Sequence, residues 1–169
     1  MKPQLFWIDG PWKGHLAVAT RPRGGDWLNH EFAGLRLAGI DKVVSLLEGE
    51  EAAQLELSGE SAAAVANGIR FVSFPIPDRG LPVSTDAARL LVEQIEDGLA
   101  AGENVAVHCR QGIGRSGMIA AAILLSTGLA PDEAMRAVSA ARGLPIPETP
   151  AQIAWLQRLA AYYPAPAHH

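Results

Sequence analysis

The sequence has little of several features that define common classes of protein. It contains one cysteine in 169 residues, so an internal disulfide is excluded, as suits a reducing cytoplasm. No apolar run approaches the roughly 18 residues of a membrane-spanning helix, and residues 1–6 lack the apolar segment of a signal peptide. A net charge of -4 argues against general nucleic-acid binding. These absences predict a cytoplasmic protein without membrane or nucleic-acid partners.

The length and composition of the chain are typical of one domain. With 169 residues and 49% hydrophobic content, the chain can bury a sizeable core. We predict a single domain over residues 1–163 and a flexible tail over 164–169, and we expect the protein to be a monomer. The two terminal histidines carry no inference.

Short apolar strands alternate with helical segments along the chain. The predicted strands are residues 15–20, 42–47, 69–74 and 105–107. Helices are predicted from an N-cap at Asp26 to Gly39, from 84 to 102 and over 118–125, 131–142 and 150–163. The stretch 48–67 is predicted to form one or two irregular helices. The charges of the acidic stretch 48–67 are interpreted as a solvated surface. This alternation predicts an α/β sandwich in which a largely parallel sheet of about five strands is flanked by helices.

The most informative stretch runs from His108 to Gly117 and reads HCRQGIGRSG. Apolar runs precede and follow it, which predicts a tight loop between a strand and a buried helix. The backbone N–H groups of such a loop form an anion-binding nest, and the helix N-terminus adds partial positive charge. We expect Cys109 at the floor of this nest, where the amides, the helix dipole and Arg115 favour the nucleophilic thiolate.

The other residues of this stretch predict a phosphate-binding site. The planar guanidinium of Arg115 can hold two phosphoryl oxygens, and Gly112 and Gly114 allow positive φ and close approach of the backbone. Ser116 can donate a hydrogen bond to the sulfur, and His108 is expected to be a hydrogen-bonding neighbour rather than a base. A buried structural cysteine beside a glycine-rich turn is the alternative. The predicted phosphate-binding residues are Arg110, Gln111, Gly112, Ile113, Gly114 and Arg115.

This pattern resembles the cysteine-based protein phosphatases, and among them the small atypical dual-specificity phosphatases. A rhodanese also uses a cysteine in an anion-binding loop, but its loop is usually one residue shorter and would here close at Gly114. The resemblance implies a phosphatase that works through a phosphocysteine intermediate and needs no cofactor. The histidines and carboxylates show no metal-ligand spacing, so no metal is expected.

The resemblance also implies roles for two residues outside the loop. Asp78 lies in the proline-rich segment 75–82, where the family carries the general acid, although Pro-Asp-Arg-Gly is also a good turn. Asp86 competes for this role but is better explained as a helix start. Gln152 occupies the place of a glutamine that positions water, but Thr149 and Gln152 also form a capping box, and both interpretations stay open. Arg142 is interpreted as a dipole partner at the end of its helix.

The substrate is less well defined by the sequence. The chain is too short for the recognition segments of the larger tyrosine-specific phosphatases, which suggests a shallow pocket open to phosphotyrosine and to phosphoserine or phosphothreonine. Arg79 and Arg110 would lie at its rim and favour acidic partners. The loop lacks the paired lysines of the phosphoinositide phosphatases. A lipid headgroup, a nucleotide or another small phosphate ester is therefore an alternative substrate, and a phosphate-binding module without turnover is an alternative function.

Overall fold

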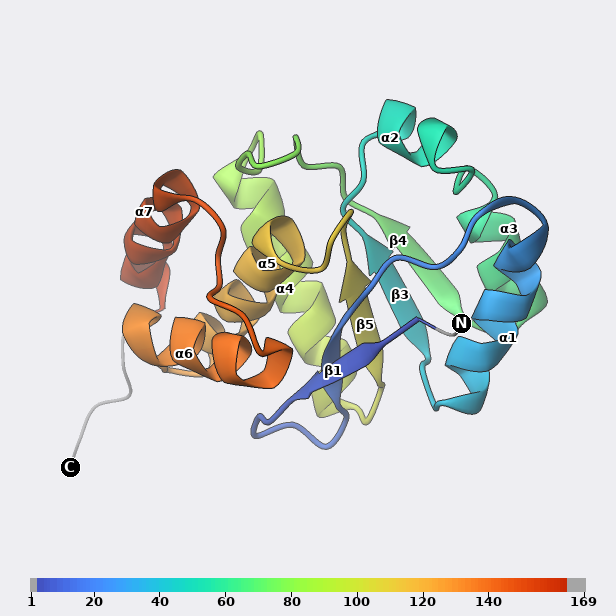
Figure 1. Cartoon of the computed structure of the whole chain (residues 1–169). Coiled ribbons are helices and arrows are strands. Elements are labelled where there is room, and N and C mark those ends of the chain that lie inside the picture. The colour runs from blue at the N-terminus through green and yellow to red at the C-terminus, as the bar shows by residue number, and fades with distance from the viewer. Residues whose placement is uncertain (1–2, 164–169) are drawn as a thin grey trace.

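A five-stranded sheet forms the centre of the computed structural model, which describes residues 3–163 (Figure 1). The predicted tail over 164–169 lies outside the described residues. The strand order is β1-β2-β5-β3-β4, with β1 antiparallel to β2 and every other pair parallel. This confirms the predicted largely parallel sheet. The strands are β1 (Leu5–Ile8), β2 (Leu16–Ala19), β3 (Lys42–Ser45), β4 (Arg70–Ser73) and β5 (Val105–His108).

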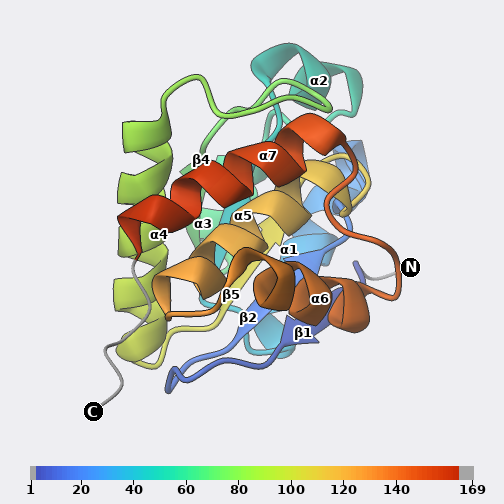
Figure 2. The ribbon, with the colours of Figure 1, turned by 90° about the vertical axis from the view of Figure 1, so that its left-hand side faces the viewer.

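The helices cover both faces of this sheet. Figure 2 looks onto the face covered by α4, α5, α6 and α7, while α1 and α3 cover the opposite face. None of the helices in the described part of the chain is long and apolar enough to cross a membrane. The helices are α1 (Leu28–Leu37), α2 (Gly49–Gln54), α3 (Glu60–Ala66), α4 (Thr85–Ala100), α5 (Gly114–Ser126), α6 (Pro131–Arg142) and α7 (Pro150–Leu159), with short 3-10 helices η1 (Gly25–Trp27) and η2 (Ala160–Tyr162).

The central strand β5 explains why the loop that follows it lies in the middle of the molecule. Its neighbours are β2 and β3, and its residues alternate between the two cores: Val105 and Val107 pack with α4 and α5, and Ala106 packs with α1 and α3. The next helix, α5, is buried along almost its whole length. Strand and helix thus hold both ends of the loop within packed structure.

Three details of the fold differ from the sequence-based prediction. The helix α5 begins at Gly114 and not at residue 118, so Arg115 and Ser116 lie in its first turn. Asp26 is not the N-cap of α1, because the 3-10 helix η1 precedes it and Trp27 occupies the cap position. Gly25 has φ of 60° and its N–H donates to the Glu56 carbonyl, which turns the chain before α1 can begin. The strand β1 has no counterpart in the prediction, because its half-buried residues at the sheet edge show no alternating pattern.

Candidate active site

The loop from Cys109 to Ile113 joins the end of β5 to the start of α5. Gly112 has φ of 71°, and a Cβ at this position would lie 3.2 Å from the carbonyl oxygen of Ala19. Gly114 has no positive φ, but a Cβ there would lie 3.1 to 3.3 Å from side-chain atoms of Glu148 and Gln152. The first glycine is therefore needed for backbone conformation, and the second for close packing.

Cys109 lies at the inner end of this loop. Its side chain is 3% exposed, and Sγ lies 3.2 Å from Oγ of Ser116, which is fully buried. Cys109 is itself part of the apolar core that surrounds α5. The structure thus brings the predicted nucleophile and the predicted hydroxyl donor into contact.

Two arginines outside the loop bind its carbonyl groups. Arg21 Nη1 donates to the carbonyl of Arg110 at 2.6 Å, and Arg142 donates from Nε to the Gly112 carbonyl at 2.8 Å and from Nη2 to the Gln111 carbonyl at 3.3 Å. Because the N–H and C=O of a trans peptide unit point in opposite directions, outward carbonyls turn the attached amides inward. This is the backbone arrangement that an anion nest requires.

The role of Arg142 corrects the interpretation drawn from the sequence. Its place at the end of α6 suggested only an interaction with the helix dipole, but its guanidinium binds two loop carbonyls and stacks over the ring of Phe6 at 4.2 Å. The sequence could not show this, because the packing of α6 beside β1 brings Arg142 to the loop.

Arg115 projects from the first turn of α5 and is buried, with 2% exposure. Nη1 and Nη2 donate to the two carboxylate oxygens of Glu51 at 2.6 and 2.9 Å, a bidentate pair. Nη1 also donates to the carbonyl of Ile76 at 2.9 Å, and Nη2 to Oδ1 of Asp78 at 3.2 Å. A guanidinium has five N–H donors, and in the described residues only Nε–H of Arg115 has no protein acceptor.

The pairing of Glu51 with Arg115 keeps both groups charged. The hydrogen bond from Arg115 holds the pKa of Glu51 below its usual range, against the opposing effect of burial. Burial alone would lower the pKa of Arg115, but the hydrogen bond to Glu51 and the charges of Cys109, Glu51 and Asp78 raise it above its usual value. The arginine therefore stays positively charged inside the protein.

A second buried carboxylate binds the histidine beside Cys109. Glu60 and His108 are each 2% exposed, and Glu60 Oε2 lies 2.7 Å from His108 Nε2, while His108 Nδ1 lies 3.2 Å from the carbonyl of Cys109. His108 is thus a hydrogen-bonding neighbour of the loop, where it is expected from the sequence. The interpretation of the charges in 48–67 as a solvated surface is wrong for Glu51 and Glu60, because α2 and α3 turn these two side chains inward.

Asp78 lies at the rim of the site, with its side chain 56% exposed. The segment that carries it is tied to α7 by Gln152, which donates from Nε2 to the Gly80 carbonyl at 3.2 Å. The other end of the same amide accepts from the backbone N–H groups of Glu148 and Thr149. The capping box is confirmed, and the side chain reaches the Asp78 segment as well, because its two ends have different partners.

The remaining predicted residues surround this centre. Arg79 and Arg110 lie at the rim, where their side chains are 64% and 38% exposed and face Glu148 and Glu51 at 3.5 and 3.8 Å. Asp86 lies in the first turn of α4 and pairs with Arg89, so the structure confirms the helix-start interpretation. No group of three or more His, Cys, Asp or Glu side chains within residues 3–163 could hold a metal ion.

Replacing Glu51 with glutamine is expected to lower the free energy of unfolding at pH 7 by about 2 kcal/mol, because it leaves the buried Arg115 charge without its counter-ion. The folded-state pKa of Glu51 is lowered, so the stability that the pair contributes is present above the unfolded pKa and is lost as the pH falls through the folded value. The difference between wild type and Glu51→Gln should therefore shrink in acid, as urea denaturation at pH 7 and about pH 3 can measure.

The matched control is Glu50→Gln, which changes the adjacent, exposed carboxylate in the same helical turn. It should leave stability within about 0.5 kcal/mol of wild type at either pH. Equal destabilisation by the two variants would show that Glu51 contributes only through general charge.

Comparison with known proteins places this chain among phosphatases. Residues 17–129, from β2 to just beyond α5, match the family model described as "Tc-R-P: Polymorphic toxin system, DSP-PTPase phosphatase". The segment holds Asp78, Cys109 and Arg115. The protein 067L of Invertebrate iridescent virus 3, named as a tyrosine phosphatase, is 38% identical over 60 residues, which are 34% of this chain and 25% of the relative. The match thus spans a quarter of that relative's length.

Solved structures of phosphatases share the fold. Kinase associated phosphatase (KAP), solved with its catalytic cysteine replaced by serine, matches with a TM-score of 0.87 at 19% identity over 96% of this chain and 97% of its own. Tk-PTP in its active form matches with a TM-score of 0.78 at 28% identity over 95% of this chain and 99% of its own. PTPMT1 in complex with PI(5)P matches with a TM-score of 0.76 at 21% identity over 93% of this chain and 96% of its own. Because the family model covers more than half of the chain, this protein belongs to the DSP-PTPase phosphatase family.

Proposed function

We propose that this protein hydrolyses phosphomonoesters of tyrosine and of serine or threonine side chains through a phosphocysteine intermediate. The observation that carries the proposal is that four side chains lie together around one loop. Cys109 Sγ lies 3.2 Å from the hydroxyl of Ser116, and the guanidinium of Arg115 lies 3.2 Å from the carboxylate of Asp78. Membership of the DSP-PTPase family supports it.

In the first step, the Cys109 thiolate attacks phosphorus and the bond to the leaving oxygen breaks. Arg115 has two N–H groups that can donate to the equatorial phosphoryl oxygens. One is Nε–H, and the other is the Nη2–H group that donates to Asp78 in this structure. A phosphoryl oxygen would therefore replace Asp78 on Arg115. Asp78, which enters this step as the neutral carboxylic acid, would turn to the leaving oxygen and transfer its proton to it, which leaves Asp78 as the carboxylate for the second step, while the guanidinium and the loop amides stabilise the charge on phosphorus.

In the second step, water attacks the phosphocysteine and releases phosphate and the thiolate. Asp78 now accepts the proton from water, and Ser116 donates a hydrogen bond to the departing sulfur. The amide of Gln152 is engaged with the backbone of Gly80, Glu148 and Thr149. We assign it the task of holding the Asp78 segment rather than of orienting water. The proposed chemistry uses neither a metal ion nor a cofactor.

The test of this function is steady-state hydrolysis of p-nitrophenyl phosphate, followed by a panel of phosphotyrosine, phosphoserine and phosphothreonine peptides, inositol phosphates and nucleotides. Turnover with the highest kcat/KM on peptides supports the proposal. A higher kcat/KM on an inositol phosphate or a nucleotide would instead support a phosphatase of small esters. Binding of phosphate without turnover would identify a phosphate-binding module.

Replacement of Asp78 with asparagine is expected to slow hydrolysis of phosphopeptides by about a hundredfold, since their basic leaving oxygen needs a proton. Hydrolysis of dinitrophenyl phosphate should fall by less than about tenfold, because that phenolate leaves unaided. The basic limb of the pH profile for phosphopeptides should also disappear. Steady-state kinetics with both substrates between pH 5 and pH 8 would check all three expectations.

The control for this variant is Asp86→Asn. Asp86 has 88% of its side chain exposed and contacts only Arg89 among the salt bridges of the described residues. Kinetics close to wild type are expected for it. If Asp86→Asn removed the basic limb and Asp78→Asn kept it, the general acid would be misassigned.

A further inference from the structure

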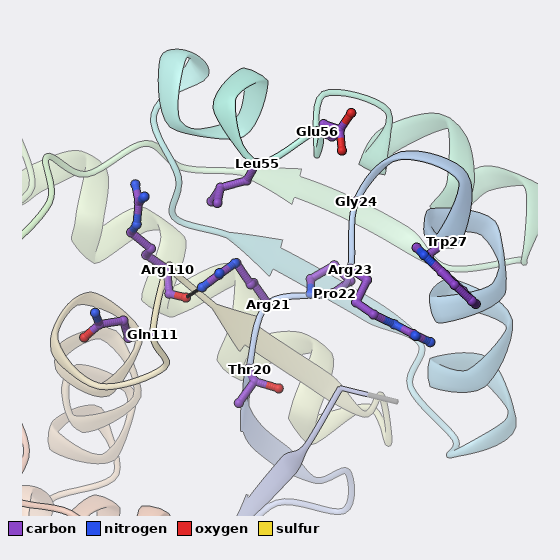
Figure 3. Close-up of a pocket in the computed structure, with 10 residues that line it drawn as sticks. All are labelled: Thr20, Arg21, Pro22, Arg23, Gly24, Trp27, Leu55, Glu56, Arg110 and Gln111. Carbon is purple, nitrogen blue, oxygen red and sulfur yellow. Dashed lines mark hydrogen bonds between the residues drawn. The ribbon is translucent and has the colours of Figure 1, made fainter. Parts of the chain in front are cut away.

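A groove of about 580 Å³ lies beside the catalytic loop (Figure 3). One end is formed by Arg110 and Gln111, which also line the cavity over Cys109. Arg21 and Arg23 follow along the groove in Figure 3, and Trp27 lies at the other end. Because Arg110 and Gln111 line both the groove and the cavity over Cys109, a substrate whose phosphate is bound in the loop can extend directly into the groove.

Three of the side chains that line this groove are arginines, in a protein whose net charge is -4. Arg23 is already neutralised, because its Nε lies 2.7 Å from the carboxylate of the buried Glu31. Arg110 lies 3.8 Å from Glu51, whose charge is mainly taken up by Arg115. Arg21 is exposed and, within residues 3–163, has no acidic side chain within salt-bridge distance. Arg21 and Arg110 thus supply the uncompensated positive charge next to the catalytic loop.

The groove is formed by structure that is already held in place. The Gly25 N–H donates to the Glu56 carbonyl at 2.9 Å, and a Cβ at Gly24 would lie 2.2 Å from the Leu55 carbonyl oxygen, so the two walls meet closely. The Arg23 guanidinium stacks over the ring of Trp27 at 4.2 Å. A preformed site loses less conformational entropy when a ligand binds.

We propose that this groove binds the segment that flanks the phosphorylated residue of a peptide substrate and selects acidic side chains in that segment. The proposal rests on the proposed function, because it assigns the substrate of the same active site. An extended peptide fits an open groove that is lined by arginines and by the apolar residues Pro22, Leu55 and Trp27, with Pro22 between Arg21 and Arg23. A free phosphate ester of small size would leave most of this volume unused.

The test compares two phosphotyrosine peptides that differ only in flanking residues, which are aspartate and glutamate in one and alanine in the other. We expect kcat/KM to be about tenfold higher for the acidic peptide, and the ratio to fall toward one at high salt because exposed charges are screened. Arg21→Glu should reverse the ratio. Activity on p-nitrophenyl phosphate serves to normalise each variant, since Arg21 also binds the loop carbonyl of Arg110.

Further variants sharpen this comparison. Glu56→Gln removes the one acidic side chain that lines the groove and should raise the preference for the acidic peptide. Arg21→Gln and Arg136→Gln each remove one positive charge. Arg21→Gln should lower the preference for the acidic peptide, whereas Arg136→Gln, on the exposed face of α6 and outside the groove, should leave it unchanged. If Arg136→Gln lowered the kcat/KM ratio of the two peptides as much as Arg21→Gln does, the preference would arise from the overall charge of the protein, and the proposal would be overturned.

Binding measurements separate this proposal from the catalytic one. Calorimetry with the Cys109→Ser variant should show about tenfold tighter binding of the acidic phosphopeptide than of the neutral one, and loss of this difference in a Cys109→Ser, Arg21→Gln double variant. This result would stand even if the wild type failed to hydrolyse any ester. Equal affinities for the two peptides would overturn the groove assignment, as would Arg21-dependent binding to vesicles containing phosphoinositides without a peptide preference.

Discussion

Cys109→Ser is expected to reduce turnover by about ten-thousandfold or more, with p-nitrophenyl phosphate and with phosphopeptides alike. The serine hydroxyl has the right size to occupy the buried position beside Ser116, but it ionises far less readily than a thiol and is a much weaker nucleophile there. Binding of inorganic phosphate should persist, because the loop amides and Arg115 are unchanged. Steady-state kinetics and calorimetry with phosphate measure the two effects separately.

The single cysteine makes this prediction easy to control. Iodoacetate should label the wild type with a stoichiometry of one and inactivate it, and should not label Cys109→Ser at all. Phosphate should protect against the labelling. Activity of the serine variant within tenfold of wild type, or full activity after complete labelling, would refute Cys109 as the nucleophile.

Arg115→Lys is expected to reduce kcat/KM by about a thousandfold and, unlike Cys109→Ser, to weaken the binding of phosphate as well. Arg115 uses one planar group for the bidentate pair with Glu51 and for bonds toward Ile76 and Asp78. A lysine ammonium has three donors and no planar fork, so it cannot hold Glu51 and two phosphoryl oxygens together. Kinetics and phosphate calorimetry on the same preparation would check this.

A suitable comparison is Arg110→Lys, which makes the same exchange at a half-exposed loop position. This variant should lose less than about tenfold with p-nitrophenyl phosphate, because the ammonium keeps the positive charge at the rim. Similar losses in the two variants would mean that the site requires positive charge only, and that the bidentate geometry of Arg115 is unimportant.

Most elements of the fold, though not β1 or η1, and the two central groups of the site, Cys109 and Arg115, could be predicted from the sequence alone. Local patterns predict β5, the loop after it and all of α5 except its first turn, because an apolar run, a glycine-rich turn and a second apolar run lie within a few neighbouring residues. The same is true of α7, whose predicted cap Thr149 is confirmed, and of the start of α4, where the sequence predicts a helix from residue 84. The spacing of Cys109 and Arg115 follows from the same short stretch.

The side chains that support these groups come from distant parts of the chain and could not be predicted from the sequence. Glu51 lies 64 residues from Arg115 in the sequence, and Arg21 lies 89 residues from Arg110. Such contacts depend on how β2, β3 and β5 pair and on where the segments after them pack, and no local pattern carries that information.

Glu50 and Glu51 show why the sequence cannot predict which acidic side chain is buried in the site. Both are acidic residues in the first turn of α2, and as helix-start residues they are equivalent in sequence. Neighbouring positions on an α-helix differ by about 100° in direction, so one side chain faces solvent and the other faces the site. Which of the two is buried depends on the orientation of α2 against the rest of the protein, where the guanidinium of Arg115 binds Glu51 while Glu50 stays exposed.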